Sequence, residues 1–83
     1  MKIRLKLFAS LREYLPAGTQ SNELELEVAD GASVQGVIDL HNVPSKRVHL
    51  VLVNGYYIQP QARAATRLKE GDVLSLWPPV SGG

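Results

Sequence analysis

The sequence predicts a small α+β domain in which one helix packs against a mixed β-sheet. Two segments alternate strictly between apolar and charged residues, which is the period of a strand with one buried face. A third segment carries apolar residues at helical spacing, and a fourth ends in Asn54-Gly55, a strong signal for a hairpin turn. The chain has 83 residues, which is enough for one hydrophobic core and excludes two-domain catalytic architectures.

Lys2 to Phe8 and Glu23 to Val28 are predicted to form the first pair of strands. The first segment alternates apolar and basic residues before ending in Phe8, whereas the second alternates apolar and acidic residues. Pairing therefore places a basic row beside an acidic row, where each opposite-charge pair contributes about 0.2–1 kcal/mol. We interpret the acidic row as a solvated strand face rather than a catalytic carboxylate cluster; it consists of Glu23, Glu25 and Glu27. Between the strands, Ser10 to Leu15 is expected to form a short helical turn.

One helix is predicted after the Asp30-Gly31 turn. The hydroxyl of Ser33 can accept a backbone N–H at the start of a helix, and apolar side chains then recur at helical spacing. This stripe consists of Val34, Val37, Ile38 and His41. Pro44 limits the helix to residues before about Val43 because proline cannot continue a helical ladder.

Three further strands follow the helix. Arg47 to Val53 has apolar residues on both parities, which indicates a central strand covered on both faces. Asn54-Gly55 suits a type I′ turn, so Tyr56 to Ile58 is expected to return as a brief strand. Val73 to Trp77 is the last strand. This order of elements describes a β-grasp, with one main helix on one face of a mixed sheet of four to five strands.

The composition excludes several classes of function. Nine basic residues against eight acidic ones give a net charge of +1, so neither a nucleic-acid partner nor a polybasic membrane anchor is expected. The absence of cysteine excludes disulfides, thiolate nucleophiles and cysteine-ligated metals. No apolar run approaches the roughly 20 residues of a membrane span. Because the chain also opens without a signal peptide, we expect a cytoplasmic location.

Few side chains are suited to catalysis. His41 and His49 are the two histidines; the first is expected to lie at the edge of the core and the second to be structural within a strand. A zinc site needs three or four suitably spaced ligands, which two histidines and scattered carboxylates do not supply. The glycines lack the spacing of a phosphate-binding loop. We therefore expect no bound metal or cofactor and a protein that is not itself an enzyme.

The C-terminal segment is the most distinctive feature of the sequence. Pro78-Pro79 follows the last strand, is stiff and cannot donate to a sheet, so residues 78–83 are expected to leave the domain of residues 1–77 as a flexible tail. Gly82-Gly83 lacks side chains and permits the closest approach of the backbone to another molecule. A partner with a narrow channel could admit this tail and reach its carboxylate. The alternative is a frayed terminus without function.

At this point the chain resembles the ThiS/MoaD family of ubiquitin-like β-grasp sulfur carriers. The similarity covers nearly the whole chain and is most specific in its ending, where an aromatic residue precedes Pro-Pro-Val-Ser-Gly-Gly. The segments that carry it are Ile3 to Ala9 with Leu11 to Glu13, Val53 to Gly55, Glu70 to Val73, and Trp77 to Gly83. Within the family, the Pro-Pro pair is more similar to the small subunit of molybdopterin synthase than to the thiamine carrier.

The resemblance implies a mechanism in which Gly83 is a cosubstrate. A ubiquitin-activating-type adenylyltransferase would use ATP to convert the Gly83 carboxylate to an acyl-adenylate. A sulfurtransferase or persulfide donor would then replace the AMP and leave a thiocarboxylate. In molybdopterin synthase, the tail enters the larger subunit, which transfers the sulfur to precursor Z. The chemistry therefore belongs to the partners, with Gly82 as the only other residue at the reacting end.

The resemblance also implies a docking surface. The hydrophobic contacts of the family would fall on Phe8, Tyr57 and Trp77, and strand parity independently places Phe8 and Trp77 on the outward face. The tail would enter the partner through Pro78, Pro79, Val80 and Ser81. The stretch from His41 to Lys46 is shorter than in the usual synthase small subunit, which leaves the pathway open.

Three other functions remain open from the sequence. The chain could carry sulfur for thiamine synthesis or another thiolation pathway. It could be a ubiquitin-like modifier joined through Gly83 to target lysines. It could also be a non-covalent β-grasp interaction module, which needs no free C-terminus.

Overall fold

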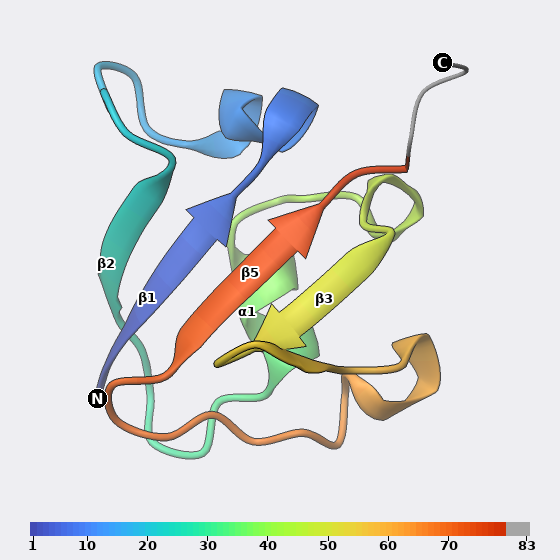
Figure 1. Ribbon diagram of the computed structural model, residues 1–83. Coiled ribbons are helices and arrows are strands. Elements are labelled where there is room, and N and C mark those ends of the chain that lie inside the picture. The colour runs from blue at the N-terminus through green and yellow to red at the C-terminus, as the bar shows by residue number, and fades with distance from the viewer. Residues whose placement is uncertain (80–83) are drawn as a thin grey trace.

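A computed structural model of the protein describes residues 1–79 as a five-stranded sheet with one α-helix on one face (Figure 1). The strands are β1 (Lys2–Leu7), β2 (Glu23–Glu27), β3 (Leu50–Val53), β4 (Tyr56–Tyr57) and β5 (Val73–Trp77), and the helix is α1 (Val34–Leu40). Three 3-10 turns complete the described elements: η1 (Ala9–Tyr14), η2 (Ser45–Arg47) and η3 (Pro60–Ala62). The strand order is β2-β1-β5-β3-β4. The β-grasp prediction is confirmed.

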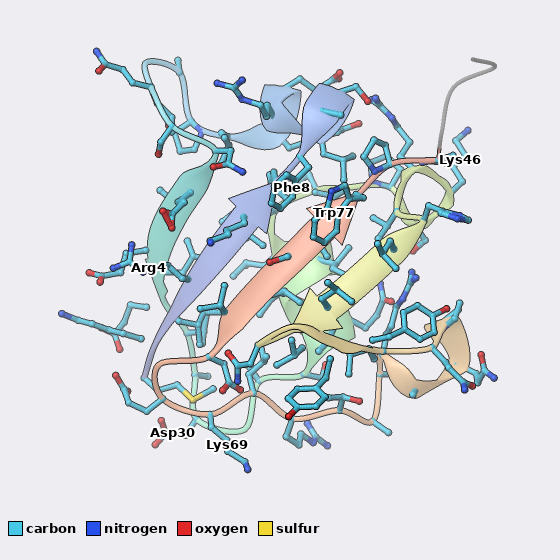
Figure 2. The ribbon with its side chains drawn as sticks, in the orientation of Figure 1. Arg4, Phe8, Asp30, Lys46, Lys69 and Trp77 are labelled. Carbon is cyan, nitrogen blue, oxygen red and sulfur yellow. The ribbon has the colours of Figure 1, made fainter. Side chains whose placement is uncertain are left out.

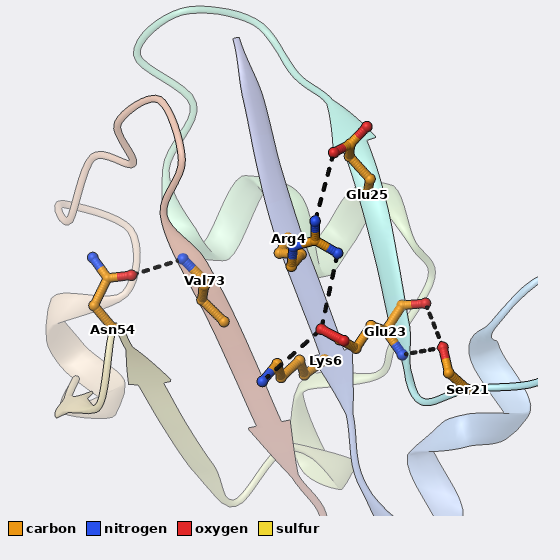
Figure 3. A network of polar contacts seen from close by, with 7 residues as sticks. All are labelled: Arg4, Lys6, Ser21, Glu23, Glu25, Asn54 and Val73. Carbon is orange, nitrogen blue, oxygen red and sulfur yellow. Dashed lines mark hydrogen bonds and ion pairs between the residues drawn. The ribbon is translucent and has the colours of Figure 1, made fainter.

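The charged ladder predicted for the first two strands is present. β1 and β2 are antiparallel and pair Lys2 with Glu27, Arg4 with Glu25, and Lys6 with Glu23. Arg4 lies 3.9 Å from both Glu23 and Glu25, and Lys6 lies 4.0 Å from Glu23 (Figure 3). These separations are long and the side chains face water, so each pair adds little stability. The apolar residues that alternate with the charged ones fix the register, because a shift by one residue would turn the leucines outward.

β5, rather than the segment before the hairpin, is the central strand. It runs parallel to β1 and antiparallel to β3. The prediction of a doubly covered strand over Arg47 to Val53 is therefore wrong in two respects. β3 begins only at Leu50, because the chain before it forms η2. Within β3 only Val51 is buried, since α1 covers one face of the sheet and no described helix covers the other.

The helix follows its predicted signals and ends early. The Ser33 hydroxyl accepts the backbone N–H of Gly36 at 3.0 Å, and the side chains of Val34, Val37 and Ile38 are at most 1% exposed. The helix ends at Leu40, three residues before the limit set by the proline. His41 closes it at the edge of the core, as predicted, and burial lowers the pKa of its imidazole below the ordinary value. No helix in residues 1–79 is long and apolar enough to cross a bilayer.

The hairpin turn is tied to the central strand. Asn54 and Gly55 have φ angles of +52° and +85°, which match the predicted type I′ turn. The Asn54 side chain donates to a carboxylate oxygen of Asp72 at 2.9 Å. It also accepts the backbone N–H of Val73 at 2.8 Å (Figure 3). The other Asp72 oxygen accepts the backbone N–H of Lys69 at 2.8 Å. One asparagine therefore joins the β3–β4 hairpin to the start of β5.

Replacing Asn54 with alanine should destabilise the fold by more than the cost of placing alanine at a positive φ. The variant loses both side-chain hydrogen bonds, and we expect the free energy of unfolding in urea to fall by about 2–3 kcal/mol. Asn42 provides the control, because it has a similar φ of +60° in the loop after the helix. Asn42→Ala should lose only about 1 kcal/mol. Equal losses in the two variants would contradict the proposed role of the side chain.

Candidate functional site

Two aromatic rings stack where the central strands end. Phe8 directly follows β1 and Trp77 ends β5, and because these strands are parallel their ends lie at the same edge of the sheet. The ring centroids are 4.1 Å apart and the planes differ by 6°, as Figure 2 shows side by side. The backbone N–H of Phe8 donates to the carbonyl of Leu76 at 3.1 Å. Such a pair adds about 0.5–1.5 kcal/mol beyond the apolar area that it buries.

The pair belongs to a larger apolar surface on the sheet face opposite the helix. Residues that pair across neighbouring strands point to the same face. Trp77 pairs with Leu50, and both Tyr57 and Ser75 pair with Leu52. This surface, called the outer apolar patch below, consists of Phe8, Leu50, Leu52, Tyr57, Val73 and Trp77.

The patch faces water. Tyr57 is 54% exposed, and the other patch members are half-buried. Ser75 lies among them and is buried. On the β1 side, Lys6 pairs with Ser75, so the charged ladder borders the patch. The result is an apolar surface bordered by charged residues on the β1 side, and apolar patches with polar borders are typical of protein-binding surfaces.

The structure brings together the three residues predicted for docking and adds three more. Phe8, Tyr57 and Trp77 share one face, as strand parity predicts for the first and last. Leu50, Leu52 and Val73 were missed. No signal in the sequence indicates that Leu50 and Leu52 face water, because the run from Leu50 to Val53 is apolar on both parities and only the structure shows that Val51 alone is buried.

The tail begins beside this patch. The backbone N–H of His49 donates to the carbonyl of Trp77 at 2.8 Å, next to the first residue of β3. Pro78 is half-buried and Pro79 is exposed, and neither has an N–H that could extend the ladder. The other residues of the predicted tail lie outside the described residues; they are Val80, Ser81, Gly82 and Gly83.

The two histidines form no site with each other. The prediction that His49 lies within a strand is wrong, because it precedes β3 and its side chain is exposed. His41 lies at the end of α1. Within residues 1–79, no three histidine, aspartate or glutamate side chains are grouped so that they could hold a metal ion.

Comparisons with known proteins agree with this architecture. Residues 5–83 match the ThiS family. The molybdopterin synthase sulfur carrier subunit of Chlamydomonas reinhardtii is 34% identical over 89 aligned residues, covering 100% of both chains.

Two solved structures are similar along almost the whole chain. A putative molybdopterin converting factor subunit 1 from Pyrococcus furiosus is 29% identical over 95% of this chain and 98% of that one, with a TM-score of 0.70. Small archaeal modifier protein 1 from Methanosarcina acetivorans is 29% identical over 99% of this chain and 96% of that one, with a TM-score of 0.66. Because its sequence matches along almost its whole length and its fold agrees, the chain belongs to the ThiS family and is a sulfur carrier of the ThiS/MoaD type.

Proposed function

We propose that the chain carries sulfur as a thiocarboxylate on Gly83, most directly for molybdopterin synthesis. One observation carries this proposal: β5 supplies Trp77 and Val73 to the outer apolar patch and continues directly into the tail. A partner that covers the patch would therefore meet the start of the tail, Pro78-Pro79, beside it. The similarity to the Chlamydomonas sulfur carrier subunit over the full length of both chains supports the choice of pathway.

The chemistry needs an external activating enzyme. A carboxylate is a poor electrophile until one oxygen becomes part of a leaving group. An adenylyltransferase of the ubiquitin-activating type would join the Gly83 carboxylate to the α-phosphate of ATP and release pyrophosphate. The terminal sulfur of a sulfurtransferase persulfide or another persulfide donor would then attack the acyl carbon and displace AMP. A thiol of the donor would cleave the resulting acyl disulfide, which leaves the thiocarboxylate on Gly83 and a disulfide on the donor. On this proposal the chain binds no cofactor or metal, and ATP is bound by the partner.

The outer apolar patch is the proposed docking surface for these partners. Aromatic side chains in such a patch provide much of the binding energy of protein interfaces. The relative from Chlamydomonas is named as a subunit, which supports a larger synthase subunit as the acceptor of the sulfur. Pro78 to Ser81 would occupy the channel that leads to the acceptor, with Gly82 at its narrowest point.

A ubiquitin-like modifier is the second candidate. Its support is the similarity to small archaeal modifier protein 1 from Methanosarcina acetivorans. Both functions begin with adenylation of Gly83 and differ in the group that then attacks the activated carboxyl group. In a sulfur carrier this group is the sulfur of a donor, and in a modifier it is the amine of a lysine. The patch and the tail are suited to either function.

Intact mass of the protein from its native host, with and without a thiol-reactive alkylator, tests the proposal. We expect a species in which sulfur replaces one oxygen and which is alkylated at Gly83. The chain has no cysteine, so no other group gives this signal; oxidation of Met1 adds mass without a reactive thiol.

Two variants complete that experiment. An extra residue after Gly83 should abolish alkylation, and deletion of Gly82-Gly83 should abolish it while the melting temperature stays unchanged. Isopeptide-linked species of higher mass would favour the modifier. A chain that stays an unreactive carboxylate with activating enzyme, ATP and sulfur donor would contradict both covalent functions and leave the non-covalent module.

Adjacent tyrosines on opposite faces of β4 test the docking surface. Tyr57 lies in the patch, whereas Tyr56 faces the other side and is 77% exposed. Tyr57→Ser should weaken binding to the activating enzyme about tenfold, which corresponds to about 1.4 kcal/mol. Tyr56→Ser removes the same ring and hydroxyl from the face outside the patch, so the affinity for the activating enzyme should stay within about twofold of the wild-type value. Titration calorimetry measures both, and equal losses would remove the patch from the interface.

A further inference from the structure

The guanidinium of Arg47 connects the turns on either side of the strand ends. It donates to the Tyr14 hydroxyl at 2.9 Å and to the Ser10 hydroxyl at 3.1 Å, and it lies 3.1 Å from the Glu13 carboxylate. It also lies 5.4 Å from the centre of the Tyr14 ring, within the range of a cation–π contact. The Glu13 and Tyr14 hydrogen bonds raise the pKa of this guanidinium. A single side chain of η2 therefore holds three side chains of η1.

Each turn adjoins one member of the site where the tail begins. η1 starts directly after Phe8, whose ring stacks on Trp77. η2 leads within two residues to His49, whose N–H holds the carbonyl of Trp77. Arg47 thus links η1, which adjoins the Phe8 ring, to η2, which adjoins the hydrogen bond from His49 to the Trp77 backbone. In Figure 1 the end of β5 lies between these two turns.

The corner between β1 and η1 needs such support. Ala9 has a φ of +51°, in the left-handed region that residues with a Cβ adopt unfavourably. Phe8, which caps η1, makes no side-chain cap hydrogen bond. A strained corner persists only when its surroundings hold it. Buried Leu11 holds the start of the turn, and Arg47 holds its far side through Ser10, Glu13 and Tyr14.

We propose that Arg47 is a positioning residue: by clamping η1 to η2 it fixes Phe8 on Trp77 and with it the direction in which Pro78-Pro79 leaves β5. The consequence for delivery of the tail rests on the proposed function. A partner that binds the patch meets an ordered start of the tail and does not have to order it on binding. Loss of the clamp should therefore raise KM for adenylation and leave kcat almost unchanged.

Arg47→Met keeps most of the side-chain length and removes every donor. Trp77 is the one tryptophan of the chain, so near-ultraviolet circular dichroism and fluorescence well below the melting temperature report the stack without any partner. We expect the Arg47→Met spectra to approach those of Phe8→Leu, in which the stack is lost. KM for adenylation should rise about threefold to tenfold. Tyr14→Phe removes one hydrogen-bond acceptor of Arg47 and should shift the Trp77 spectra and the KM in the same direction. This variant decides the question if Arg47→Met fails to fold.

Arg67→Met is the matched control, since Arg67 is an exposed arginine whose side chain bonds to the carbonyl of Gly31. Its spectra and KM should equal those of the wild type. Unchanged Trp77 spectra in both Arg47→Met and Tyr14→Phe would overturn the proposal, even if adenylation slowed. Changed spectra with an unchanged KM would also overturn it, because the orientation would not matter to delivery. Failure of the wild type to be adenylated would instead refute the proposed function, while the spectra would still decide whether the clamp exists.

Discussion

The position of β5 between β1 and β3 determines where the outer apolar patch and the start of the tail lie. Its parallel pairing with β1 brings Phe8 to the edge at which Trp77 ends the strand. Its antiparallel pairing with β3 places Leu50 opposite Trp77 at that same edge. Three segments that are distant in sequence therefore meet where the tail begins. If β5 were an edge strand, the tail would leave with an unpaired neighbour on one side and with half of the patch absent.

The same arrangement explains how so small a chain stays folded although one face of its sheet is apolar and exposed to water. α1 covers one side of the sheet and packs fully buried side chains against Leu5, Leu74 and Leu76. The core on that side supplies the stability, because burial of apolar area is the dominant favourable contribution to folding. No helix in residues 1–79 covers the other side, which carries the outer apolar patch. The charged ladder of β1 and β2 limits the patch to the far half of that face, and a smaller patch lowers the tendency to self-associate.

Local patterns predicted the parts of the fold that depend on local physics. The alternation in β1 and β2, the Ser33 cap and the Asn54-Gly55 turn each follow from the geometry of a few neighbouring residues, and all were predictable. The exposure of Leu50 and Leu52 was not, because an apolar run does not state which of its faces another element covers. The Arg47 clamp was also hidden, since its partners Tyr14 and Ser10 lie 33 and 37 residues away in sequence.

A carrier of this kind has to be recognised by more than one partner, and the structure limits how that can happen. The proposed function requires an activating enzyme and then an acceptor, and each must reach the same terminal carboxylate. Because β5 joins the patch directly to the start of the tail, a partner that docks on the patch as proposed covers Trp77 and its neighbours. On that proposal two partners cannot be bound in productive positions at once, and passing the tail to the second requires dissociation from the first. Tight binding at the patch would slow that exchange, since affinity differences arise mainly in the dissociation rate. A modest patch with an ordered start of the tail meets both demands, because the ordering favours productive binding without adding contact area.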